Sequence, residues 1–165
     1  MRLSWLLALF FFFFGCKTIK MSYIEAGDDN LRIKGKSIYF TNDTLKLEIV
    51  NVSGDTLLIN NPVEKQIEFF DTKSNKWTQL KILRCPCAAP CAPVPDMIRL
   101  FPSQKLNFTW DLHYNICEPP EQGYLPNTRT LTAQPGKYRV KFFYRLPQGK
   151  TFVLYYDFQI KNKKL

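Results

Sequence analysis

The residues whose types and spacing could support chemistry are four of the five cysteines, those that follow Cys16, and the one histidine. Cys85, Cys87 and Cys91 stand in a proline-rich segment, and Cys117 follows 26 residues after Cys91. An even number of cysteines in an exported chain indicates disulfides first. A bridge between Cys85 and Cys87 would be strained, because disulfide partners need converging Cβ vectors at a suitable spacing. We therefore expect at least one bridge to Cys117, with the pairing otherwise open.

A metal site is the alternative use of the same residues. Cys87 and Cys91 with His113 could bind Cu(I) or tetrahedral Zn(II), since thiolate and imidazole are ligands that suit these ions. A blue-copper site needs two histidines, and this chain has one. A thioredoxin-like redox pair needs a helix N-terminus to lower the thiol pKa, and the prolines between these cysteines forbid a helix.

Catalytic motifs are not found in the sequence. It contains no G-x-S-x-G elbow, no H-E-x-x-H pair and no glycine-rich phosphate loop. A histidine at the end of a strand, as we expect for His113, is more often a surface or hydrogen-bonded residue than a catalytic base. We predict a protein that is not an enzyme and has no cofactor.

The first sixteen residues predict export. Arg2 precedes an apolar run from Leu3 to Phe14, and Gly15 and Cys16 close it. As a helix the twelve-residue run would reach only about 18 Å, against a hydrocarbon core of about 30 Å. A short positive start, an apolar centre and a small residue are typical of a secretory signal peptide. An ordinary signal peptide cut elsewhere, or an uncleaved anchor, would share these features.

The Gly15-Cys16 ending resembles the lipobox of bacterial lipoproteins. The resemblance implies that residues 1–15 are removed and that Cys16 becomes the lipidated first residue. We therefore expect a protein attached by lipid to a membrane of the bacterial cell envelope. The residues just after the cysteine, Lys17 to Lys20, carry no acidic side chain that would direct surface display. We expect the periplasmic side of the outer membrane.

The positive charge of the chain limits the classes of binding partner that we expect. The formal net charge is +9, and loss of Arg2 leaves 22 basic and 14 acidic side chains, or +8. A basic surface can bind anionic lipid, polyanionic glycan or nucleic acid. Export makes nucleic acid a poor partner, so we expect the membrane and an envelope protein or glycan.

Apolar and polar residues alternate over much of the chain after Ser37, which predicts strands. We expect residues 16–36 to be a lipidated N-terminus and tether, and residues 37–161 to form one domain with a cysteine- and proline-rich loop over residues 84–96. Short strands with turn signals every eight to twelve residues are typical of an antiparallel sandwich, here of about 7–9 strands. The residues from Tyr114 to Gln134 show no such pattern. The expected strands are 37–40, 45–49, 56–59, 67–69, 77–82, 97–101, 106–112, 138–144 and 152–160. The expected core aromatic residues are Phe108, Trp110, Tyr138, Phe142 and Phe158.

The order of these turns and strands resembles a known domain type. The stretches that carry the resemblance are Asn51-Val52-Ser53-Gly54-Asp55, Ile67-Glu68-Phe69-Phe70-Asp71, Lys76-Trp77, Pro102-Ser103-Gln104, Phe108-Thr109-Trp110-Asp111 and Pro135-Gly136-Lys137-Tyr138-Arg139-Val140. They look like the immunoglobulin-like domains of bacterial envelope proteins, including those similar to the intracellular proteinase inhibitor family. The resemblance implies an immunoglobulin-like β-sandwich over roughly residues 37–160. The leading prediction is a non-catalytic binding or scaffolding module, with metal delivery and protease inhibition as alternatives.

Overall fold

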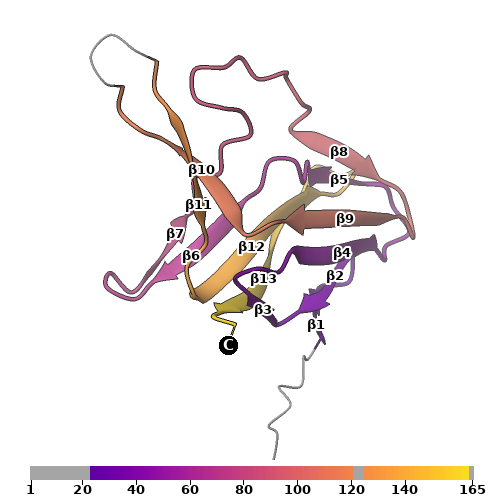
Figure 1. Cartoon of the computed structure of the whole chain (residues 1–165). Coiled ribbons are helices and arrows are strands. Elements are labelled where there is room, and N and C mark those ends of the chain that lie inside the picture. The colour runs from indigo at the N-terminus through magenta and orange to yellow at the C-terminus, as the bar shows by residue number, and fades with distance from the viewer. Residues whose placement is uncertain (1–22, 121–124, 164–165) are drawn as a thin grey trace, which may run out of the picture.

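The computed structural model describes residues 23–120 and 125–163, which form thirteen strands and no helix (Figure 1). The strands are β1 (Tyr23–Gly27), β2 (Leu31–Lys36), β3 (Ile38–Phe40), β4 (Leu45–Asn51), β5 (Leu57–Asn60), β6 (Ile67–Asp71), β7 (Lys76–Gln79), β8 (Met97–Leu100), β9 (Lys105–Trp110), β10 (His113–Cys117), β11 (Thr128–Thr132), β12 (Gly136–Arg145) and β13 (Thr151–Lys161). The predicted all-β class is confirmed. Within these ranges, therefore, there is no helix that could cross a bilayer.

Two larger sheets and one small sheet make up the fold. The first has the strand order β1-β2-β4-β9, and the second has the order β3-β13-β12-β5-β8 with β6 and β7 joined to β12. The third is the pair β10-β11. The inner faces of the two larger sheets meet, since the Phe108 ring of β9 lies edge-on to the Phe142 ring of β12 with centroids 5.6 Å apart.

The core aromatic residues are those the alternation predicts. Phe108, Trp110 and Phe142 are each 1% exposed, Phe158 is 3% exposed and Tyr138 is 6% exposed. Period-two burial explains this agreement, because one face of each strand is turned inward. β9, however, ends at Trp110 rather than continuing to Leu112. Leu112 takes a φ of 60° and starts the turn into β10, while its side chain stays fully buried.

The predicted tether was wrong over residues 23–36. β1 and β2 form an antiparallel pair, and β2 pairs with β4 from Leu31↔Asn51 to Lys34↔Glu48. Leu31 and Ile33 are fully buried. The alternation of apolar and polar residues in β2 is hard to recognise in the sequence, because the next inward position is Gly35, which has no apolar side chain. Residues 16–22 lie outside the described residues.

The stretch expected to be irregular, from Tyr114 to Gln134, contains the hairpin of β10 and β11. Its register runs from His113↔Thr132 to Cys117↔Thr128. None of the residues of these two strands is fully buried, although Tyr114 packs against the core, so the hairpin leaves no clear apolar alternation in the sequence. Together with β1 and β2, this pair explains why thirteen strands are found where 7–9 were expected.

The strand order departs from a purely antiparallel arrangement. β3 pairs in parallel with β13, from Gln159↔Ile38 to Lys161↔Phe40. Along one edge, β12 pairs first with β6 and then with β5. The structure thus supports an all-β fold with two facing sheets, while its assignment as immunoglobulin-like remains a prediction.

Candidate functional site

The four cysteines of the described domain form two disulfides. Cys85 is bonded to Cys91 with Cα atoms 5.8 Å apart, and Cys87 is bonded to Cys117 with Cα atoms 5.6 Å apart. The second is the bridge to Cys117 that the spacing argument favours. It joins the loop between β7 and β8 to the end of β10, so it ties together segments 30 residues apart.

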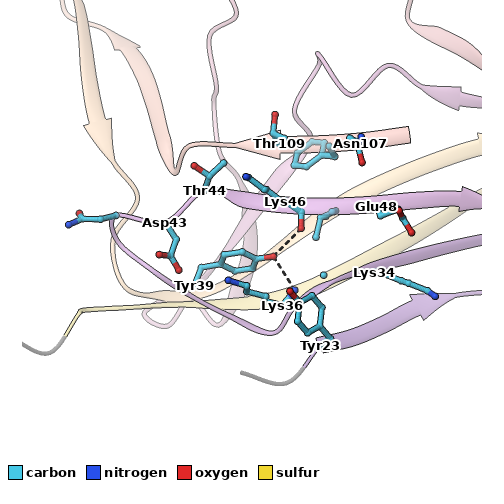
Figure 2. A pocket seen from close by; sticks show the side chains of 14 residues that line it. Tyr23, Lys34, Lys36, Tyr39, Asp43, Thr44, Lys46, Glu48, Asn107 and Thr109 are labelled. Carbon is cyan, nitrogen blue, oxygen red and sulfur yellow. Dashed lines mark hydrogen bonds between the residues drawn. The ribbon is translucent and has the colours of Figure 1, made fainter. Parts of the chain in front are cut away.

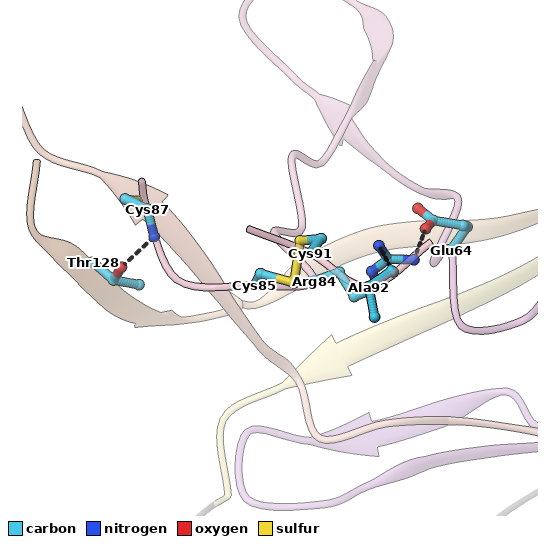
Figure 3. The surroundings of a disulfide bond; sticks show 7 residues. All are labelled: Glu64, Arg84, Cys85, Cys87, Cys91, Ala92 and Thr128. Carbon is cyan, nitrogen blue, oxygen red and sulfur yellow. Dashed lines mark hydrogen bonds and ion pairs between the residues drawn. A yellow bond between two sulfur atoms is a disulfide. The ribbon is translucent and has the colours of Figure 1, made fainter. Parts of the chain in front are cut away.

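Further contacts hold this loop, as Figure 3 shows. The Arg84 guanidinium lies 3.0 Å from the Glu64 carboxylate and donates to the carbonyl oxygen of Ala92 at 2.5 Å. The backbone N–H of Cys87 donates to the Thr128 hydroxyl on β11 at 2.7 Å. These contacts hold the exposed loop in one conformation. Its prolines leave it with few backbone N–H groups that could donate hydrogen bonds.

The alternative metal ligands do not converge in this oxidised form. Cys87 and Cys91 belong to different disulfides. His113 stands at the opposite end of β10 from Cys117, roughly 13 Å along the strand. Its Nδ1 lies 2.7 Å from the carbonyl oxygen of Asp111, which can only accept, so Nδ1 carries the proton in that contact. No group of three or more His, Cys, Asp or Glu side chains in residues 23–120 and 125–163 could hold a metal ion.

A hollow of about 1020 Å³ lies beside the start of β1, and residues of β2, β4 and β9 line it together with Tyr39 of β3 (Figure 2). Three lysines from β2 and β4 line it, namely Lys34, Lys36 and Lys46, and Tyr23 stands at its edge. Lys34 is 3.6 Å from Glu25. In the part of the chain that the structure describes, the ammonium groups of Lys36 and Lys46 have no hydrogen-bond or ion-pair partner. Asp43 and Glu48 also line the hollow, so its three lysines and two carboxylates leave a net charge of +1.

The Tyr39 hydroxyl explains why the hollow exists. It accepts from the Lys36 backbone N–H at 3.1 Å and donates to the Lys46 carbonyl oxygen at 3.3 Å. These two groups lie just past Lys34↔Glu48, where the pairing of β2 with β4 ends. The hydroxyl thus gives a hydrogen-bond partner to one backbone group of each strand, and it lies between the two strands where their direct pairing has ended. Burial raises the pKa of Tyr39 and keeps it neutral in this position.

An ordered aromatic cluster occupies the outer face of the second sheet. The Arg139 guanidinium lies 4.3 Å from the centre of the Trp77 ring and 4.0 Å from that of Tyr155. It also pairs with Glu68 at 2.6 Å. The cluster presents aromatic side chains, and Glu68 already neutralises the charge of Arg139. The cluster is therefore better suited to contact with a partner surface than to binding a free anion.

The predicted lipid site, Cys16, lies outside the described residues. Sequence reasoning missed the lysine-lined hollow, because it did not include β2 in the domain and so could not place Lys36 beside Lys46. No motif marks these residues. Only the pairing of β2 with β4 brings them together.

No protein-family model and no curated protein matches this chain. A solved structure described as the X-ray structure of Northeast Structural Genomics Consortium target SoR45 is similar to it, with a TM-score of 0.41 and 12% identity. The match covers 88% of this chain and 85% of that chain.

Proposed function

We propose that this chain is an exported, lipid-anchored protein of the bacterial envelope that acts by binding or scaffolding and not by catalysis. The observation that carries the proposal is the pair of disulfides Cys85–Cys91 and Cys87–Cys117. Disulfides persist in oxidising, extracytoplasmic compartments. The signal-like segment from Met1 to Gly15 supplies the route there.

The proposed anchor would hold the domain close to the membrane. Seven residue steps join Cys16 to Tyr23, and they span at most about 25 Å. The lysine-lined hollow lies beside Tyr23. Lysines near an anionic surface add about 1 kcal/mol each to binding. Lys36 and Lys46 would then face the headgroups, and the stapled loop and aromatic cluster would remain available to an envelope protein or glycan.

The finer fold assignment belongs to the same proposal. Two facing sheets with an aromatic core are compatible with an immunoglobulin-like relationship, and such domains commonly act as binding modules. Protease inhibition rests on that resemblance alone.

The anchor is tested with Cys16→Ala. We expect this change to abolish incorporation of labelled fatty acid and to release the protein from the membrane fraction. Thr18→Ala is the matched control, because it lies two residues away and should leave labelling intact. Unchanged labelling and unchanged partitioning of the Cys16→Ala chain would refute the anchor.

The disulfides are tested by mass spectrometry of the protein taken from the native envelope. We expect a mass lower by two hydrogens per bridge for the two bridges, with no bound metal. Reduced cysteines carrying zinc or copper would instead support the metal-delivery alternative.

A further inference from the structure

Two arginines flank one leucine on the outer face of the second sheet. Leu58 of β5 is in register with Arg99 of β8 on one side and with Arg145 of β12 on the other. Directly opposite residues of antiparallel strands point to the same face and lie about 4.5–5.5 Å apart. The Cα atoms of Arg99 and Arg145 are therefore about 10 Å apart, with Leu58 between them.

These side chains line a hollow of about 600 Å³, a size common among small-molecule sites. Its walls include the apolar side chains of Phe101 and Pro147, and Thr56 adds a hydroxyl. Phe101 is 54% exposed, which is unusual for a large aromatic side chain in this domain. The hollow thus combines two cations with an apolar rim.

Short turns hold the rim in place. Leu146 and Lys150 close a turn by a 3.0 Å backbone hydrogen bond, and Gly149 adopts a φ of 86° that side chains rarely allow. The backbone N–H of Phe101 donates to the Gln104 side chain at 2.8 Å. The hollow is therefore pre-formed in the absence of a ligand.

The two arginines differ from every other described arginine. Arg32, Arg84, Arg129 and Arg139 each pair with a glutamate. Within residues 23–120 and 125–163, the guanidinium groups of Arg99 and Arg145 have no hydrogen bond or ion pair. The two residues lie on either side of Leu58 in neighbouring strands. Uncompensated like charges placed side by side over a hollow indicate a place for an anion.

We propose that this hollow binds a phosphate monoester attached to an apolar or aromatic group. A phosphate monoester carries a charge of about −1.5 to −2 near neutral pH and has three acceptor oxygens. It can therefore bind two guanidinium groups at once, and it matches their charge better than a ligand with a single carboxylate would. Leu58, Phe101 and Pro147 would contact the apolar part. The hollow lies at the Arg145 end of β12, while Ile160 near the chain's C-terminus pairs with Gly136 at the other end. Tyr23, where β1 starts, pairs with Lys36 rather than with the Leu31 end of β2, so the hollow does not depend on how the chain is anchored.

The test uses the full chain in a non-ionic detergent and calorimetric titration with phenyl phosphate. We expect saturable binding at one site, tighter than the binding of inorganic phosphate or benzoate. Arg99→Gln and Arg145→Gln should each weaken it about tenfold or more, since each removes a charge-assisted hydrogen bond. Arg32→Gln is the matched control, because it removes the same charge from the other sheet and should leave the affinity unchanged.

Three outcomes would overturn the proposal. The first is no saturable binding of phenyl phosphate to a chain that unfolds cooperatively. The second is equal loss of affinity in the Arg32→Gln chain, which would indicate attraction by net charge alone. The third is benzoate binding as tightly as phenyl phosphate, which would exclude a phosphate-selective site.

Discussion

Asn51 shows how a single buried polar side chain organises one end of this domain. It is fully buried at the end of β4, and its amide donates to the carbonyl oxygens of Asp55 at 2.7 Å and Leu100 at 2.8 Å. Its side-chain oxygen accepts from the backbone N–H and the hydroxyl of Ser53. All its polar atoms are satisfied, so it joins the end of β8 to the turn that leads into β5.

Asn51→Ala should lower the free energy of unfolding by about 2–4 kcal/mol, because two carbonyl groups lose their donors inside the protein. Urea unfolding measures the change. Asn107→Ala is the control, since Asn107 is exposed on β9 and makes no described side-chain hydrogen bond. Equal stability of the two variants would contradict the role of Asn51.

Loss of the Tyr144 proton should lower the stability of the folded protein at alkaline pH. Burial, followed by its hydrogen bond to Asp28, raises the pKa of Tyr144 from 10.0 to about 12. The folded protein holds the proton longer than the unfolded chain, so its stability is intact below pH 10.0 and falls as pH rises toward 12. The slope from this one group reaches about 1.4 kcal/mol per pH unit. Unfolding measurements across this range should show the decline, and Tyr144→Phe should make it shallower; a flat profile would refute it.

At the scale of elements, β2 packs closely against the second sheet at Gly35. A Cβ atom there would lie 2.5 Å from Leu47 Cδ2 and 2.8 Å from the Tyr156 hydroxyl. Gly35→Ala should therefore cost about 1–3 kcal/mol of stability through overpacking. Gly54→Ala is the control, because no atom lies within 4 Å of its added Cβ. Thermal unfolding of both variants checks the prediction, and a Gly35→Ala chain as stable as Gly54→Ala would contradict it.

The two disulfides should differ in their contribution. The chain-entropy model gives about 3–4 kcal/mol for Cys87–Cys117, which spans 30 residues, and about 2 kcal/mol for Cys85–Cys91, which spans 6. Replacing each pair by serine and measuring urea unfolding tests the order. A larger loss from the Cys85–Cys91 pair would mean that the link to the β10–β11 hairpin is not the stabilising one.

At the scale of the whole molecule, the lysine-lined hollow lies beside Tyr23, the first described residue after the proposed anchor. The double change Lys36→Glu and Lys46→Glu in the full Cys16→Ser chain should weaken its binding to anionic vesicles about tenfold or more, from about 1 kcal/mol per lysine. Vesicle co-sedimentation at low salt measures this. The control is Lys73→Glu, in the turn between β6 and β7, combined with Lys76→Glu at the exposed start of β7. An equal loss in both double variants would show that net charge alone acts.

The sequence by itself determined the all-β class, nine of the strands and the aromatic core. Alternation of period two is a local property, and it is visible wherever one face of a strand must be buried. It did not reveal β2, where Gly35 interrupts the apolar pattern, or the β10–β11 hairpin, which has no fully buried residue. It also left the pairing of the cysteines open, because several pairings satisfy the same spacing.

Tertiary structure alone decided which residues share a surface. Arg99 and Arg145 are 46 positions apart, and each is an ordinary outward-facing strand residue in the sequence. They flank Leu58 only because β5 pairs with both β8 and β12 in one register. Lys36 and Lys46 likewise meet only through the pairing of β2 with β4 and the Tyr39 hydroxyl beyond it. The alternation within one strand indicates which face is buried, but it does not say which other strand of the sheet lies beside it.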